Sequence, residues 1–77
     1  MNIQEENNKR MQILRDNFKL LREERGWSVE QLALISGISK SKLSGAENGT
    51  RISLDTLFTL CDIYSVKPHE MFLPMLN

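Results

Sequence analysis

Cysteine and histidine are nearly absent from this 77-residue chain, which has one of each, Cys61 and His69. A single cysteine excludes an internal disulfide and is typical of a reducing compartment, so we predict a cytoplasmic protein. One histidine, one cysteine, no catalytic carboxylate pair and no phosphate-binding loop leave nothing from which to assemble an active site or a metal site. We therefore predict a protein that is not an enzyme and has no cofactor and no metal.

Long apolar runs are also missing. None approaches the roughly 20 residues of a membrane span, so no membrane partner is expected. Net charge is missing as well, because ten basic and ten acidic residues cancel. The charges are unevenly placed: residues 9–51 include nine basic and five acidic side chains, and residues 53–77 include one and three. A solvated surface of mixed charge explains this pattern without a nucleic-acid partner, and charge alone favours that explanation.

The first half of the chain predicts two helices within one small domain. Residues 1–10 are polar, and we predict that they fray. Apolar residues then recur at helical spacing from Met11 to Leu21, which predicts a helix from about residue 8 to Arg25. Ser28 followed by Gln31 is typical of a capping box, so a second helix is expected over residues 29–36, ending at Gly37.

The second half predicts two or three more helices. Ser39 is a suitable N-cap for a third helix that ends at Gly49, and Ser53 for a fourth. Pro68 suits the first turn of a short last helix. No segment alternates with period two. We predict an all-α domain of four to five short helices over residues 11–73, followed by a tail over residues 74–77.

The third predicted helix has two unlike faces. Leu43 and Ala46 point to one side, and the opposite side consists of small or polar residues together with one lysine. A small Ala33, a glycine at position 37 and an apolar anchor at Leu43 have the spacing of a helix-turn-helix, which presents its second helix to the DNA major groove.

Three segments together resemble the phage-repressor family of helix-turn-helix proteins (Cro/lambda-repressor-like, xenobiotic-response-element type): Leu32-Ala33, Gly37-Ile38-Ser39 and Glu47-Asn48-Gly49. The likeness covers about residues 17–72. It implies that the outward face of the third helix contacts bases, through Lys40, Ser41, Ser44 and Gly45. It also implies phosphate contacts from Ser28, Asn48, Thr50 and Arg51. Arg22 and Glu47 match a structural ion pair of the family.

Two positions depart from the family pattern. Val29 stands where a glutamine that contacts DNA is common, and Gly45 stands where a long polar side chain is usual. A glycine inside a helix costs about 1 kcal/mol relative to alanine. Either the backbone approaches DNA or a partner closely at Gly45, or the glycine is only tolerated. With fewer side chains to contact bases, specificity is expected to depend partly on DNA shape.

Several apolar residues lie where a solvated surface is expected, which predicts a partner surface. We predict a homodimer formed by the last two helices and the tail, with these candidate interface residues: Phe58, Phe72, Leu73, Met75 and Leu76. The leading hypothesis is a sequence-specific transcriptional regulator that binds double-stranded DNA as a homodimer on a palindromic operator. The alternative is the same fold used as a protein-interaction module, antitoxin-like or adaptor, with weak or no DNA binding.

Overall fold

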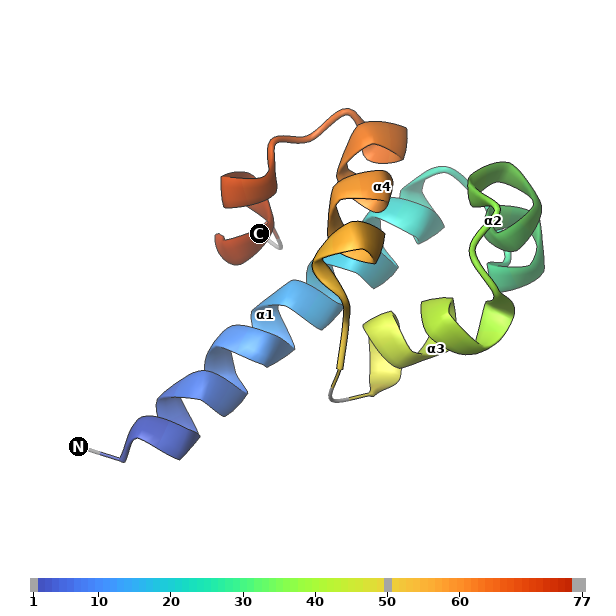
Figure 1. The fold of residues 1–77 in the computed structure, drawn as a ribbon. Helices are drawn as coiled ribbons and strands as arrows, with labels where there is room; N and C mark the ends of the chain where they lie inside the picture. The colour runs from blue at the N-terminus through green and yellow to red at the C-terminus, as the bar shows by residue number, and fades with distance from the viewer. Residues whose placement is uncertain (1, 50, 76–77) are drawn as a thin grey trace.

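The structure is a computed structural model that describes residues 2–49 and 51–75. It consists of four α-helices, α1 (Ile3–Glu24), α2 (Val29–Ser36), α3 (Lys40–Asn48) and α4 (Leu54–Tyr64), followed by a short 3₁₀ helix, η1 (Pro68–Phe72). The described residues contain no strand, so the all-α prediction is confirmed. Helix α1 packs against α3 and η1, and α2 packs against α3 and α4 (Figure 1).

The core is formed by one face from each element. Leu14, Phe18 and Leu21 of α1 meet Leu32 of α2 and Leu43 of α3. The remaining buried apolar residues come from α3, α4 and η1: Ala46, Leu57, Leu60, Cys61, Tyr64 and Met71. The α4 residues that helical spacing assigned to one face, Leu57, Leu60, Cys61 and Tyr64, are all buried.

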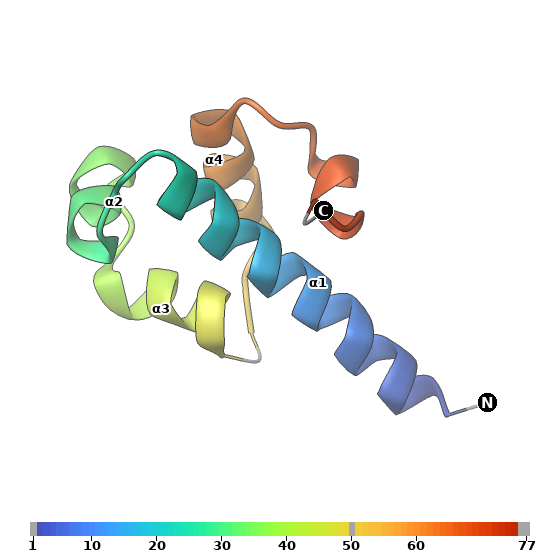
Figure 2. The same ribbon diagram turned by 180° about the vertical axis from the view of Figure 1, so that it is seen from behind.

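The prediction of a frayed segment over residues 1–10 is wrong for residues 3–10, because α1 begins at Ile3 and extends far beyond the body of the domain (Figures 1 and 2). Asn2 caps this helix, since its side chain accepts a hydrogen bond from the backbone N–H of Glu5. Two acidic residues, Glu5 and Glu6, occupy the first turn, where the helix dipole favours negative charge. We missed these signals because the segment is polar. A cap and acidic residues in the first turn stabilise a helix end without burying side chains.

The caps of α2 and α3 confirm the predicted starts of both helices. Ser28 and Gln31 form a reciprocal capping box at the start of α2. Ser39 accepts a hydrogen bond from the backbone N–H of Lys42 at the start of α3. Gly37 ends α2 with a left-handed backbone, φ 72° and ψ 10°, which glycine adopts at little cost. This turn directs the chain from α2 into α3.

A buried asparagine attaches the C-terminal segment to α1, and sequence patterns did not reveal it. The Asn17 side chain is 1 % exposed and donates to the carbonyls of Met71 and Leu73, at 2.8 and 2.9 Å. Its oxygen accepts from the N–H of Met75 at 3.3 Å. These partners lie more than fifty residues away in sequence, so no local signal identifies them.

Candidate nucleic-acid interface

Helix α3 lies at the surface with its apolar side turned inward. Leu43 and Ala46 are buried in the core, and Glu47 is 8 % exposed. Lys40, Ser41 and Asn48 are exposed. Ser44 and Gly45, in the middle of the predicted outward face, are only half-buried. The outward face is therefore open to solvent at both ends of the helix and partly shielded at its centre.

A largely buried ion pair fixes the end of α3 to α1, as the resemblance implied. The Arg22 guanidinium donates two hydrogen bonds to the Glu47 carboxylate, at 2.8 and 2.9 Å, and a third to the Trp27 carbonyl at 2.7 Å. The hydrogen bonds to Glu47 raise the pKa of Arg22 above its ordinary value. Bidentate pairs of this kind orient both side chains strongly. The pair positions α3 and leaves its outward face free.

The turn that follows α3 is supported by a second arginine, which sequence analysis did not single out. Arg15 of α1 donates to the Gly49 carbonyl at 2.8 Å. Gly49 itself leaves no room for a side chain, because a Cβ there would lie 2.7 Å from the Gly45 carbonyl oxygen. Of the predicted phosphate contacts, Asn48 and Arg51 flank this turn and are exposed. Thr50 lies outside the described residues.

Lys40, the only predicted base-contacting residue with a charge, forms an ion pair with Glu30 of α2. Both side chains are more than half exposed, so solvent screens the pair. The hydrogen bond from Lys40 lowers the pKa of Glu30. In the DNA-free protein the Lys40 ammonium therefore already has an anionic partner, and a DNA contact competes with that partner.

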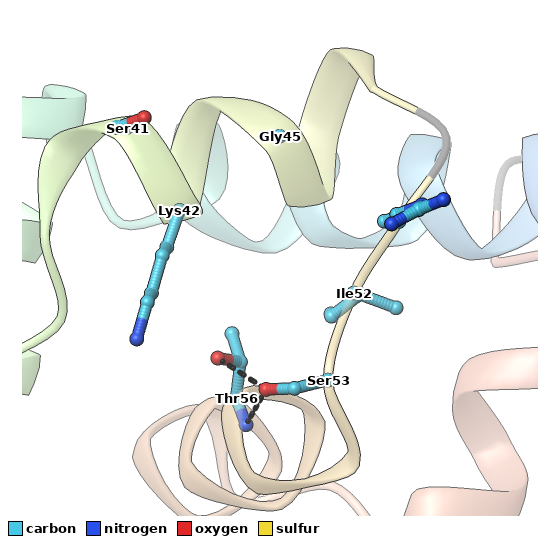
Figure 3. A pocket seen from close by; sticks show the side chains of 7 residues that line it. Ser41, Lys42, Gly45, Ile52, Ser53 and Thr56 are labelled. Atoms are coloured by element: carbon cyan, nitrogen blue, oxygen red, sulfur yellow. Dashed lines mark hydrogen bonds between the residues drawn. The ribbon is translucent and has the colours of Figure 1, made fainter.

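An open pocket of about 340 Å³ lies beside α3, between this helix and the start of α4 (Figure 3). It is lined by Ser41, Lys42, Gly45, Arg51, Ile52, Ser53 and Thr56. The Lys42 side chain extends from α3 toward Thr56 at the first turn of α4. Lys42 was not among the predicted DNA contacts. The sequence feature that could have identified Lys42 is that it is a second lysine on the same short helix, two residues after Lys40, and it is exposed.

The two departures from the family pattern, at Gly45 and Val29, have different structural explanations. A Cβ at Gly45 would meet only the Arg51 carbonyl oxygen, at 3.8 Å, which is ordinary van der Waals contact. The fold therefore does not require glycine at this position. Val29 is half-buried and packs against the core, whereas Ser28 beside it is exposed and caps α2. Val29 contributes to packing at a position where the family commonly contacts DNA.

The predicted interface residues that the structure describes lie at the surface or close to it. Phe58, Phe72 and Leu73 are 49 %, 51 % and 58 % exposed. Met75 is half-buried and packs against the core, and Leu76 lies outside the described residues. Leu34 and Ile35 of α2 are also exposed, Leu34 the more so at 87 %.

Among residues 2–49 and 51–75, no cluster of three or more metal-binding side chains is present. The described helices include none that is long and apolar enough to cross a membrane. Cys61 is buried, and burial raises the pKa of its thiol. Tyr64 is also buried, which raises its pKa to about 12, and its hydroxyl has no hydrogen-bond partner in the described structure.

The geometry agrees with the comparison with known families, in which a helix-turn-helix model matches residues 18–71. The chain belongs to the Cro/C1-type helix-turn-helix family. This family is lambda-repressor-like, and its members are DNA-binding regulators, so the protein is a DNA-binding helix-turn-helix protein. No curated protein and no solved structure shows significant similarity to the chain.

Proposed function

We propose that the protein is a sequence-specific transcriptional regulator that binds a palindromic operator as a homodimer. The observation that carries this proposal is the mounting of α3. Its inner face is fixed by Leu43 and by the Arg22–Glu47 pair, and its outer face, which begins with Lys40 and Ser41, takes no part in the core. A helix mounted in this way is suited to enter the major groove, which is about 12 Å wide.

The roles of the outward residues follow from their chemistry. The Lys40 ammonium is a donor for guanine O6 and N7, and the hydroxyls of Ser41 and Ser44 donate to or accept from either base pair. Lys42 and Arg51 line the pocket beside α3 and supply two positive charges for a phosphate strand. Ser28, at the exposed N-terminus of α2, and Asn48 are suited to further phosphate contacts.

The experiment that tests this function is the affinity for random duplex DNA, measured by fluorescence anisotropy between 50 and 200 mM salt. We expect affinity to fall steeply with salt, since each neutralised phosphate contributes about 0.9 to the slope of log K against log salt. Arg51→Ala is expected to lower the slope by about one. Lys67→Ala, which removes an exposed charge from the N-terminal end of η1, is the matched control and is expected to change nothing.

Sequence specificity is tested by selecting bound duplexes from a random pool. Wild-type protein is expected to enrich one palindrome, and Lys40→Ala is expected to relax the preference at one base pair per half-site. Affinity that does not depend on salt, or a selection that enriches no sequence, would contradict the proposal.

The alternative, a protein-interaction module, is supported by α2. Leu34 and Ile35 expose large apolar side chains on it, and the zero net charge of the chain weakens long-range attraction to DNA. If random duplex does not bind even at low salt, this alternative replaces the DNA-binding proposal.

A further inference from the structure

The N-terminal part of α1 extends from the domain as an arm, defined here as residues 3–11. Figures 1 and 2 show the N-terminal end of this helix extending beyond α3, α4 and η1. Its described side-chain hydrogen bonds and ion pair, Gln4–Asn8, Arg10–Asn7 and Lys9–Glu6, all run within the arm itself. An isolated helix as short as the arm would be marginal in water, so the arm depends on its continuity with the packed half of α1 or on a partner.

One face of the arm is in line with the buried face of α1. Positions 3, 7, 10, 14, 17 and 21, defined here as the seam, are separated by alternating steps of four and three, so they lie on one side of the helix. Ile3, Leu14 and Leu21 are the apolar members of this seam, and its arm half also includes the polar Asn7 and Arg10. In the second half of the seam Leu14, Asn17 and Leu21 are buried by the protein's own core. In the first half Ile3 is 69 % exposed, and an open hollow of about 530 Å³ is lined by Asn7, Arg10, Met11 and Phe72.

We propose that the arm of a second copy of this chain, running antiparallel, covers this seam. With Asn7 at the centre, Ile3 of each copy lies at the hollow formed by Met11 and Phe72 of the other. Charge complementarity supports this occupant. Each arm has acidic residues at its start and basic residues toward the domain, so the antiparallel arrangement brings Glu6 within a turn of Arg10 of the partner subunit. The inference rests on the dimeric state proposed above and assigns it a surface.

This arrangement also places the two α3 helices suitably for a palindrome. Arg15 and Arg22, which bind Gly49 and Glu47 at the end of α3, lie about 12 and 22 Å along the helix from Asn7. The two-fold axis doubles these values to about 24 and 45 Å, a range that includes the roughly 34 Å between half-sites. Both arginines are about a quarter turn around α1 from the seam, so both α3 helices lie on the same face of the pair.

The test is the sedimentation equilibrium of the full chain without DNA, for the wild type, Glu6→Arg, Arg10→Glu and an equimolar mixture of the two variants. The wild type is expected to form a weak dimer, since two and a half turns per copy form a small interface. Each variant alone places like charges opposite one another, so we expect the dissociation constant of its dimer to rise at least tenfold. In the mixture opposite charges face one another again, so the dissociation constant of the heterodimer is expected to lie within about threefold of the wild-type value.

Glu5→Arg is the matched control, because it makes the same charge change in the same turn but on the side of α1 opposite the seam. It is expected to leave dimerisation unchanged. Circular dichroism melting verifies that each variant is folded, which is expected since Glu5, Glu6 and Arg10 take no part in the core.

Three results would overturn the inference: a wild type that stays monomeric up to millimolar concentration, single variants that dimerise normally, or a mixture that does not recover. A dimer lost through Phe58→Ser and not through Glu6→Arg would assign the interface to α4 instead. The outcome is separable from the proposed function. A monomer that binds DNA contradicts the arm interface alone, and a dimer that binds no DNA contradicts the function alone.

Discussion

The two faces of α3 differ in their burial and in their contacts with the rest of the protein. The inner face consists of Leu43, Ala46 and Glu47, all buried, and it is joined to α1 by a bidentate ion pair. The outer face, from Lys40 to Asn48, is exposed or half-buried, and its one ion pair, Lys40–Glu30, lies in solvent. The two ion pairs of this short helix are therefore expected to contribute very differently to the free energy of unfolding. The comparison teaches that changes to the inner face alter stability, and changes to the outer face alter binding.

The largest expected effect follows from breaking the inner ion pair. Glu47→Ala leaves the Arg22 guanidinium without its carboxylate in a largely buried site, which costs about 3 to 5 kcal/mol of unfolding free energy. Urea denaturation followed by Trp27 fluorescence measures the loss. The double variant Arg22→Met with Glu47→Leu removes both charges, and it is expected to regain a large part of the stability. A loss below 1 kcal/mol in the single variant would contradict the weight given to this pair.

A smaller loss is expected at the turn after α3. Gly49→Ala places a Cβ against the Gly45 backbone, so the turn has to shift, and overpacking of this kind costs about 1 to 3 kcal/mol. The shift also disturbs the Gly49 carbonyl that accepts from Arg15. Thermal unfolding measures the effect, and an unchanged melting temperature would show that the turn adapts freely.

The same substitution one turn earlier is expected to have the opposite sign. Gly45→Ala has room for its methyl group and removes a helix-interior glycine, so stability is expected to rise by about 1 kcal/mol. DNA affinity of the same variant decides between the two accounts of this glycine. A loss of tenfold or more indicates close backbone approach, and a change within twofold indicates tolerance. A fall in stability would contradict the packing described here.

The smallest effect at neutral pH is expected for Tyr64→Phe. The buried Tyr64 hydroxyl lacks a partner in the described structure, so its removal is expected to change stability by less than about 1 kcal/mol. Alkaline pH separates the two proteins. The pKa of Tyr64 is raised to about 12, above the unfolded value of about 10, so the unfolded state ionises first and wild-type stability falls as pH rises between these values.

Tyr64→Phe has no ionisable hydroxyl, so it is expected not to show this decrease in unfolding free energy, which approaches about 1.4 kcal/mol per pH unit. Guanidinium denaturation at pH 7, 10 and 11 makes the comparison. Parallel curves for wild type and variant would contradict a protonated, buried hydroxyl.

Local signals in the sequence predicted the fold well. Ser28, Gln31 and Gly37 set the bounds of α2 through hydrogen bonds within a few residues, and those bounds are confirmed. The start of α1 was missed because a polar helix supported by Asn2 and by side-chain pairs has no apolar stripe to reveal it. Asn17 was missed because its partners are distant in sequence.

The candidate site was predicted in outline. The spacing of Ala33, Gly37 and Leu43 indicated the helix-turn-helix, and the family resemblance supplied the Arg22–Glu47 pair. The Lys40–Glu30 pair and the position of Lys42 beside the start of α4 depend on how α2, α3 and α4 pack, which the sequence alone does not specify. The base and phosphate contacts assigned to α3 and its flanks stay predictions.

Amide chemical shifts recorded by NMR during titration with the selected duplex test the central claim most directly. If the outer face of α3 enters the major groove, the largest shifts are expected from Lys40 to Gly45 and at Asn48 and Arg51, with small changes at Leu34, Ile35 and the arm. Large shifts confined to α2 or α4, with α3 unchanged, would contradict the account.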